Sequence, residues 1–238
     1  MESMQKIIAG VNHFRQKYFE EQRDFFEEIV KYQQKPRALF ITCSDSRINP
    51  NLITQTEPGE LFIVRNAGNI VPPYGAAASG EAGTIEYAVA ALGIRNIIIC
   101  GHAQCGAIAG LLDEDSVVGL PAVQSWFAHA EATRRIVRTK YAGLDPQKMR
   151  VAAAEENVLV QLNNLSTHPT VAALLSSREL RVCGWYYDIA AGRISQYDQS
   201  QGHFVELGVE AQHTSPMPVR STANGKLDLQ VAGLVEVS

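Results

Sequence analysis

The stretch RNIIICGHAQCG, residues 95–106, joins a continuous apolar run to a group of potential metal ligands. It contains three consecutive isoleucines instead of alternating apolar and polar residues, which is typical of a strand buried on both faces. The segments RALFITC (37–43) and ELFIVRN (60–66) have the same character. Because segments of helical periodicity separate these runs, the sequence predicts an α/β fold with a central, mainly parallel β-sheet flanked by helices.

Helical periodicity extends outward from these runs in both directions. Apolar residues recur at steps of three and four in six segments: 5–32, 80–93, 104–112, 121–140, 147–165 and 168–177. Toward the C-terminus, RVCGWYYDI (181–189) and ISQYD (194–198) predict two strands joined across AAGR. We therefore predict an N-terminal helical arm at 1–35, an α/β domain carrying the chemistry at 36–198, and an irregular tail at 199–238.

Composition narrows the class of protein. The chain has 238 residues, 46% of them hydrophobic, which suits one large globular domain. The net charge is −4 and no basic run occurs, so we expect neither nucleic acid nor an anionic membrane as a partner. No apolar run is long enough to span a bilayer and no signal-peptide core is found, which favours the cytoplasm. Four cysteines in a chain of this length do not make a disulfide scaffold.

Chemically active side chains follow two of the predicted strands. Cys43 ends the strand at 37–43, and His102 and Cys105 follow the strand that begins at residue 95. Sites in open α/β sheets form at the carboxyl ends of the strands, so the fold should bring these three residues together. Two thiolates and an imidazole are good zinc ligands, and zinc prefers four-coordination. Asp45 can supply the fourth bond, as in a structural site, or stand off and leave a catalytic position open.

Arg47 bears on this choice, because a guanidinium pairs with a carboxylate through two parallel hydrogen bonds. If Arg47 holds Asp45, the carboxylate stays ionised and off the metal, where it can orient a hydroxide nucleophile. If the pair breaks, Asp45 can move onto zinc and close the site. One short segment would then encode an active and an inactive state, which is a hypothesis.

Each of these signals also has an ordinary structural explanation. A lone cysteine is more often a core residue than a ligand, and Asp-Ser-Arg after a strand can simply cap a helix. Convergence at adjacent strand ends is what favours a metal site. Cys100 and Cys183, which lie within predicted strands, are expected in the core. The histidines without a partner pattern are expected at the surface or at helix caps: His13, His129, His168, His203 and His213.

Two paired motifs establish a family resemblance. CSDSR at 43–47 and GHAQCG at 101–106 resemble the motifs of the β-class carbonic anhydrases. EPGELFIVRNAGNIVPPYG (57–75) and TIEYAVAALG (84–93) are similar to the same family, and the resemblance covers roughly residues 1–198. Within the family, the chain looks closer to the plant-type branch, which includes cyanobacterial and bacterial cyanase-associated enzymes.

The resemblance implies a reaction and the residues that carry it. It implies Zn2+ held by Cys43, His102 and Cys105. By the hypothesis above, Asp45 would be a ligand in the closed state only. It implies reversible hydration of carbon dioxide to bicarbonate and a proton, by a zinc-bound hydroxide that the Asp45–Arg47 dyad positions. Carbon dioxide is small and apolar, so its hydration at neutral pH needs such a nucleophile in a dry pocket. Two thiolates donate more charge than imidazoles, which should tie the activity to alkaline pH.

The resemblance also implies a substrate pocket built from two subunits. The positions that match the pocket of the plant-type branch are Gln34, Phe62, Tyr87 and Gly106. Gln34 would donate a hydrogen bond to the substrate oxygen, and Phe62 and Tyr87 of a neighbouring subunit would form an apolar wall. The branch that binds inhibitory bicarbonate has a tryptophan three residues before the first zinc cysteine. Phe40 occupies that position here, which does not favour such regulation.

Other functions remain open at the level of sequence. Hydrolysis of carbonyl sulfide or carbon disulfide would use the same residues. A catalytically silent zinc-stabilised binding protein would keep Asp45 locked on the metal. A redox protein using Cys43 and Cys105 would form a disulfide and hold no stoichiometric metal.

Partners follow from the same resemblance. We expect a homodimer or a higher assembly of dimers, because the family pocket spans two subunits and the aromatic N-terminal helix needs a surface to cover. Carboxysomal relatives carry C-terminal extensions that bind shell or scaffold proteins, so the tail at 199–238 suggests a carboxysome scaffold partner. The expected location is the cytoplasm, with the carboxysome as the alternative.

Overall fold

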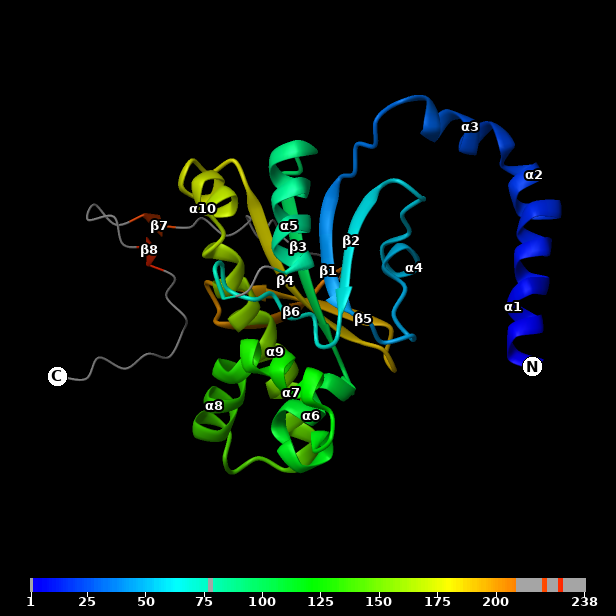
Figure 1. Ribbon diagram of the computed structural model, residues 1–238. Helices are drawn as coiled ribbons and strands as arrows, with labels where there is room; N and C mark the ends of the chain where they lie inside the picture. Colours follow the sequence, from blue (N-terminus) through cyan, green and yellow to red (C-terminus); the bar gives the residue numbers. More distant parts are fainter. Residues whose placement is uncertain (1, 77–78, 209–219, 222–226, 229–238) are drawn as a thin grey trace. The chain divides into compact units, whose positions relative to one another are not determined.

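The computed structural model describes residues 2–76, 79–208, 220–221 and 227–228 (Figure 1). The chain divides into two compact units, residues 1–35 and 36–238. Within the described residues, no helix combines the length and the apolar character needed to cross a membrane.

The first unit is helical almost throughout. It comprises α1 (Glu2–His13), a π-helical turn η1 (Phe14–Tyr18), α2 (Phe19–Glu21) and α3 (Arg23–Lys31). The interruption falls at Gln22, where φ is −115° and the backbone leaves helical geometry. The helix expected over 5–32 is therefore present with one break.

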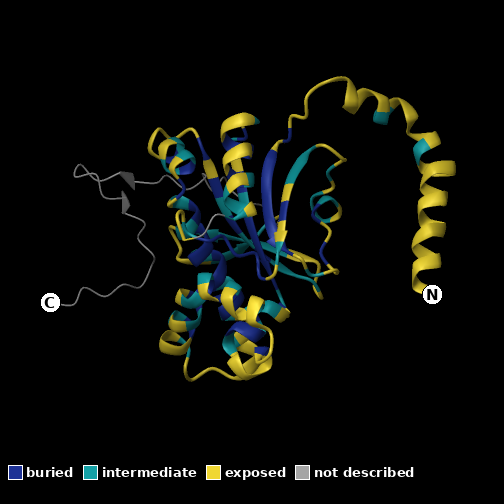
Figure 2. Cartoon of the chain, viewed as in Figure 1, coloured by how far each residue is buried: buried dark blue, intermediate teal, exposed yellow. Residues whose placement is uncertain are grey.

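Aromatic side chains pack against one another in this unit. Residues of α1, in contrast, are coloured as exposed (Figure 2). Ring centroids lie 5.2–6.2 Å apart within the group Phe14, Tyr18, Phe19, Phe25 and Phe26. The residues left exposed on α1 include Ile7 at 61%, Ile8 at 54% and Val11 at 54%. The unit by itself therefore leaves an apolar helical face uncovered.

A six-stranded sheet forms the centre of the second unit. In spatial order it contains β2 (Leu61–Asn66), β1 (Ala38–Cys43), β3 (Asn96–His102), β4 (Arg181–Asp188), β5 (Arg193–Asp198) and β6 (His203–Glu206). The first four strands are parallel, and β5 and β6 are added antiparallel. The predicted central, mainly parallel sheet is confirmed.

The sheet continues further along the chain than the sequence predicted. The expectation of an irregular segment from residue 199 is wrong for β6, which pairs with β5. The ring of Phe204 on β6 lies 5.4 Å from that of Tyr197 and 6.4 Å from that of Tyr186. Four residues at a sheet edge are too short to display a clear alternation, which explains the miss. The two-residue strands β7 (Arg220–Ser221) and β8 (Leu227–Asp228) pair with each other, and the rest of the tail lies outside the described residues.

Helices connect and cover the strands. The α-helices are α4 (Pro50–Thr54), α5 (Gly80–Glu86), α6 (Gly106–Leu112), α7 (Pro121–Phe127), α8 (Glu131–Lys140), α9 (Pro146–Ser166) and α10 (Pro169–Ser176). Short helical segments of other types are η2 (Tyr87–Ala91), η3 (Glu114–Val117) and η4 (Ala128–Ala130). Four of the α-helices begin with proline, which suits the first helical position because its missing N–H would have no helical partner.

The longest helix, α9, packs directly on the middle of the sheet. It contacts β3 and β4, and Val158 on α9 lies over a glycine of each strand. A Cβ placed on Gly101 would come within 2.7 Å of the Val158 side chain, and one placed on Gly184 within 2.8 Å. The two glycines therefore permit a close approach of helix and sheet.

An apolar cluster lies at one end of the sheet, where α6, α7 and α8 gather (Figure 1). Its buried members include Ile48, Ile70, Ile108 and Phe127, together with the side chains of two cysteines. This cluster makes an apolar setting for the residues that end β1 and follow β3.

Candidate metal centre

Parallel pairing brings the predicted ligands to one edge of the sheet. β1 ends at Cys43 and its neighbour β3 ends at His102, with Thr42 paired in register with Cys100. Cys105 follows three residues later as the N-terminal cap residue of α6. The carboxyl ends of two adjacent strands and the start of one helix thus converge, as the sequence predicted.

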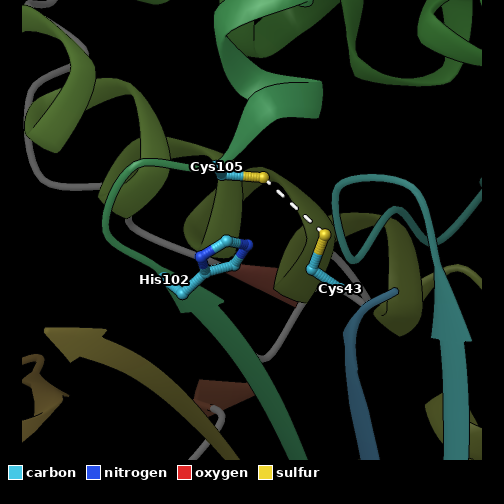
Figure 3. Close-up of side chains that lie close together, drawn as sticks. All are labelled: Cys43, His102 and Cys105. Atoms are coloured by element: carbon cyan, nitrogen blue, oxygen red, sulfur yellow. Dashed lines mark hydrogen bonds between the residues drawn. The ribbon is translucent and has the colours of Figure 1, made fainter. Parts of the chain in front are cut away.

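The three side chains point toward a common centre (Figure 3). The Sγ atoms of Cys43 and Cys105 are 3.8 Å apart, and the ligand atoms of all three residues lie within 4.8 Å of one another. His102 is fully buried, and each cysteine is 5% exposed. The cluster is therefore compact and shielded from bulk water.

His102 is oriented so that one ring nitrogen faces this centre without a partner. Its Nδ1 lies 2.8 Å from the carbonyl oxygen of Ala103, to which it can donate a hydrogen bond. Nε2 is buried and has no hydrogen-bond partner among the described residues. A buried nitrogen left in this state carries a free energy cost unless something binds it, and the Nδ1 bond selects the tautomer with a lone pair on Nε2.

This donor set fits zinc. For tetrahedral coordination with Zn–S bonds of about 2.3 Å, two thiolate sulfurs should lie about 3.8 Å apart. The measured Sγ–Sγ separation is 3.8 Å. Two sulfurs and one imidazole nitrogen are the kinds of atom that bind zinc, and the separation of the two sulfurs matches that expected around one zinc ion.

The two thiols differ in acidity. The pKa of Cys43 is lowered, first by the hydrogen bond with the Cys105 thiol and then by the side chain of His102 and backbone N–H groups. The pKa of Cys105 is raised, because its proton is held by the Cys43 sulfur and because the thiol is buried. The pair shares a proton, and a metal ion would displace it because the thiolate is the form that binds.

Asp45 and Arg47 form the ion pair that their spacing suggested. Arg47 donates from Nε to Oδ1 of Asp45 at 2.9 Å and from Nη2 to Oδ2 at 2.7 Å, and its backbone N–H also donates to Oδ1 at 3.0 Å. The hydrogen bonds from the Arg47 side chain hold the pKa of Asp45 well below its usual range. Oδ2 of Asp45 lies 3.9 Å from Nε2 of His102, so the ionised carboxylate stands beside the ligand cluster.

Two contacts that the sequence did not predict support this arrangement. Arg65 on β2 donates from Nη2 to the carbonyl oxygens of Cys43 and Asp45, at 3.0 and 2.7 Å. Arg47 also donates to the carbonyl oxygen of Gln104, at 3.2 Å. The loop after β1 is thereby tied to the neighbouring strand and to the loop that holds Cys105. No local sequence signal marks Arg65, because its partners are backbone atoms about 20 residues away.

The residues expected in the substrate pocket occupy three places. Phe62 on β2 and Tyr87 on η2 have ring centroids 6.1 Å apart, so these two meet within one chain. Gly106 begins α6 directly after Cys105. Gln34 follows α3 and is exposed in the first unit. Their roles toward substrate stay predictions.

The remaining cysteines and His168 were not predicted as metal ligands, and their burial can be compared with the positions expected for them. Cys100 is fully buried, and burial raises the pKa of its thiol to about 12, as suits the core position expected for it. Cys183 is partly buried on β4. His168 is the N-terminal cap residue of α10, which is one of the two kinds of position expected for it, although it is only 3% exposed. Its Nε2 lies 3.0 Å from the carbonyl oxygen of Pro72.

A row of amide side chains on α9 was also missed. Asn157 and Gln161 are fully buried, and with Asn164 they hydrogen bond the backbone of the loop that follows β2. Their spacing of i, i+4 and i+7 places them on one helical face. Polar residues at that spacing in an otherwise apolar helix are the signal that could have revealed the contact.

The chain is similar to known proteins over a region that includes the candidate metal ligands. The chain matches the carbonic anhydrase family over residues 38–194. It is 48% identical over 198 residues to a carbonic anhydrase of Synechococcus elongatus, covering 83% of this chain and 72% of that protein. The solved structure of the β-carbonic anhydrase CcaA resembles it with a TM-score of 0.84 at 48% identity, covering 87% of this chain and 92% of that one.

A more distant solved structure extends the comparison. A tetrameric β-carbonic anhydrase from the ascomycete Sordaria macrospora has a TM-score of 0.73 at 29% identity, covering 87% of this chain and 98% of that one. The family match spans both loops that meet at the cysteine–histidine cluster. Sequence, fold and donor geometry therefore agree, and this chain belongs to the β-class carbonic anhydrase family of enzymes.

Proposed function

We propose that this enzyme catalyses the zinc-dependent, reversible hydration of carbon dioxide to bicarbonate and a proton. Cys43, His102 and Cys105 would hold the metal, and Asp45 with Arg47 would act beside it. The observation that carries the proposal is a buried set of three donors, with its two sulfurs at zinc spacing, next to a carboxylate held in place by a guanidinium.

Zinc, when bound, supplies Lewis acidity that provides a hydroxide nucleophile near neutral pH, a property for which carbonic anhydrases are themselves the usual illustration. The chain supplies the orientation. Asp45 stays ionised beside Arg47 and offers an acceptor oxygen next to the ligand cluster, so it can orient a hydroxyl group by accepting a hydrogen bond from it. The apolar cluster around the cysteines limits competing water, which suits an apolar substrate.

The contacts of Asp45 favour the open state of the site. Both of its carboxylate oxygens accept hydrogen bonds from Arg47, and a move onto the metal would break these bonds. This supports an active enzyme over a silent zinc-stabilised protein, in which Asp45 would be a fourth ligand. Carbonyl sulfide and carbon disulfide are also linear and apolar, so they are the substrates to assay beside carbon dioxide.

We also propose a homodimer or a higher assembly of dimers. The tetrameric enzyme of Sordaria macrospora supports this by similarity, as does the apolar face of α1. In such an assembly Gln34 and Gly106 of one subunit would meet Phe62 and Tyr87 of another. The carboxysome scaffold partner and the location, cytoplasmic or carboxysomal, stay predictions.

Metal analysis and kinetics test the proposal together. We expect one zinc per chain in the purified protein, and stopped-flow hydration of carbon dioxide that increases between about pH 6 and pH 9, because two thiolates leave less positive charge on the metal. Zinc without hydration activity at any pH would indicate the silent binding protein. A Cys43–Cys105 disulfide without stoichiometric metal would indicate the redox alternative.

A further inference from the structure

A backbone N–H from a neighbouring loop reaches the first candidate ligand. The N–H of Gly68 donates to Sγ of Cys43, with an N–S distance of 3.4 Å. Both residues are buried. Gly68 belongs to the loop that follows β2, so this contact comes from outside the segment containing Cys43. It leaves the sulfur bonded to a fixed donor in a setting of low polarity.

The peptide group that donates this hydrogen bond is held at its other end by Trp126. The indole Nε1–H of Trp126, on α7, donates to the carbonyl oxygen of Ala67 at 2.8 Å. In a trans peptide, the carbonyl of Ala67 and the N–H of Gly68 point in opposite directions within one plane. Trp126 and Cys43 therefore engage the two ends of one peptide dipole, and each bond polarises the peptide in favour of the other.

Asn157 holds the next carbonyl along the loop. Its Nδ2 donates to the carbonyl oxygen of Gly68 at 2.9 Å, and its side chain is fully buried. Its Oδ1 accepts hydrogen bonds from Thr133 at 3.1 Å and from Gln161 at 3.0 Å. These partners fix the orientation of the amide, so it acts as a rigid support for Gly68.

The loop conformation also requires glycine at position 68. Its φ is +86°, in the left-handed region that side chains rarely adopt. A Cβ at this position would lie 3.2 Å from Cβ of Ala107, in the first turn of α6. The close approach of the Gly68 backbone to the site is thus built into the fold.

We propose that Trp126 and Asn157 are positioning residues that aim the Gly68 N–H at the thiolate of Cys43 and thereby tune the metal. This rests on the proposed function, since it takes Cys43 as a ligand. A hydrogen bond to a thiolate withdraws part of the charge that the sulfur donates. With two thiolate ligands, that withdrawal leaves the metal a stronger Lewis acid than the ligand set alone would allow.

Cadmium-113 NMR tests the contact directly. The full-length protein is loaded with 113Cd and labelled with 15N-glycine, and through-bond coupling from 113Cd to amide protons is recorded. We expect a cross peak from 113Cd to the Gly68 amide proton, transmitted through the N–H···S bond. Trp126→Phe keeps an aromatic ring but removes the donor, so it should weaken this coupling and move the Gly68 amide proton upfield.

Trp185→Phe is the matched control. It makes the same chemical change at the other tryptophan, whose Nε1 donates to Oε1 of Gln196 at 3.1 Å on the antiparallel side of the sheet. In the Trp185→Phe protein, the amide proton signal of Gly68 should be the same as in the unaltered protein. In competition with a chelating dye, Trp126→Phe should lower zinc affinity about tenfold, because the Ala67–Gly68 peptide loses the contact that holds it against the ligand; this is the lower end of what loss of a ligand's supporting contact costs. Trp185→Phe should leave zinc affinity unchanged.

The outcomes separate the two proposals. Failure of the protein to take up one 113Cd per chain would count against the proposed metal site. Uptake of cadmium with no coupling to Gly68 in the unaltered protein would overturn the positioning role while leaving the site intact. The positioning role would also be overturned if Trp126→Phe left both the Gly68 amide shift and the zinc affinity unchanged.

Discussion

Two of the four non-glycine residues with positive φ in the described part of the chain lie in the loops of the metal centre. Gln104, between His102 and Cys105, has φ of 54°, and Asn69, next to Gly68, has φ of 47°. Non-glycine residues rarely adopt such values, and they persist where surrounding contacts hold them. The hydrogen bond from Arg47 to the Gln104 carbonyl is one such contact. Single residues at this site are therefore held by partners that are distant in sequence.

Arg47→Ala should abolish most of the activity without removing the metal. The substitution deletes the two side-chain bonds that hold Asp45 but touches none of the three donor residues. We expect hydration to fall by about 100-fold or more, as when a positioned acid–base group is lost, while zinc stays at one per chain. Stopped-flow assays and metal analysis on the same sample measure both.

Arg37→Ala is the control for that substitution. Arg37 also pairs with a carboxylate, Glu60, but it is 78% exposed and plays no part at the ligand cluster. The Arg37→Ala enzyme should hydrate carbon dioxide as fast as the unaltered enzyme. Full activity in Arg47→Ala would show that Asp45 needs no partner.

At the scale of elements, α9 joins the sheet to the loop after β2. Oε1 of Gln161 accepts the backbone N–H of Val71 at 2.9 Å, and the side chain is fully buried. Gln161→Leu would leave that N–H without a partner, which costs about 1–3 kcal/mol of unfolding free energy. Chemical denaturation at one fixed protein concentration measures the change.

Gln147→Leu supplies the same substitution at an exposed position of α9. Gln147 lies exposed in the first turn, where its backbone N–H donates to Oδ1 of Asp145. Its effect should stay within about 0.5 kcal/mol. An equal loss in both variants would mean that the amide–loop bonds do not stabilise the fold.

The packing of α9 on β4 gives a second prediction at this scale. Gly184→Ala would press a methyl group against the stiff side chain of Val158, at 2.8 Å, and against Leu162 at 3.0 Å. We expect a loss of about 1–3 kcal/mol from overpacking. Gly83→Ala, in the exposed part of α5 where a Cβ meets no atom within 4 Å, should instead stabilise by up to about 1 kcal/mol. Thermal and denaturant unfolding measure the stability of both variants. An unchanged stability of Gly184→Ala would contradict the close packing of α9 on β4.

At the scale of the whole molecule, the apolar face of α1 predicts assembly. Ile7 and Val11 lie one helical turn apart and are 61% and 54% exposed. Ile7→Glu combined with Val11→Glu should reduce the particle mass measured by light scattering, because burying two carboxylates is unfavourable. Lys6→Glu changes the net charge by the same amount without altering the apolar face, and it should leave the mass unchanged. A mass unaffected by the double substitution would place the subunit contact elsewhere.

Much of the architecture was predictable because its signals are local. Continuous apolar runs identified the strands that became β1, β2 and β3, and the order of strands and helices implied a parallel sheet with a site at its carboxyl edge. Cys43, His102 and Cys105 could be grouped because each lies at the end of a strand or just after it. β6 was missed because four edge residues carry too little periodicity.

What the sequence by itself determined is the set of elements and the chemical character of the ligands, since both depend on residue type and short-range spacing. Only the tertiary structure decided that two sulfurs lie at zinc spacing, that Nε2 of His102 faces them with no partner in the described part of the chain, and that the Gly68 N–H reaches Cys43. The physical reason is that these contacts involve backbone atoms and long-range packing. A backbone N–H is present at almost every position of a chain, so its partner is selected by the fold and not by the residue type.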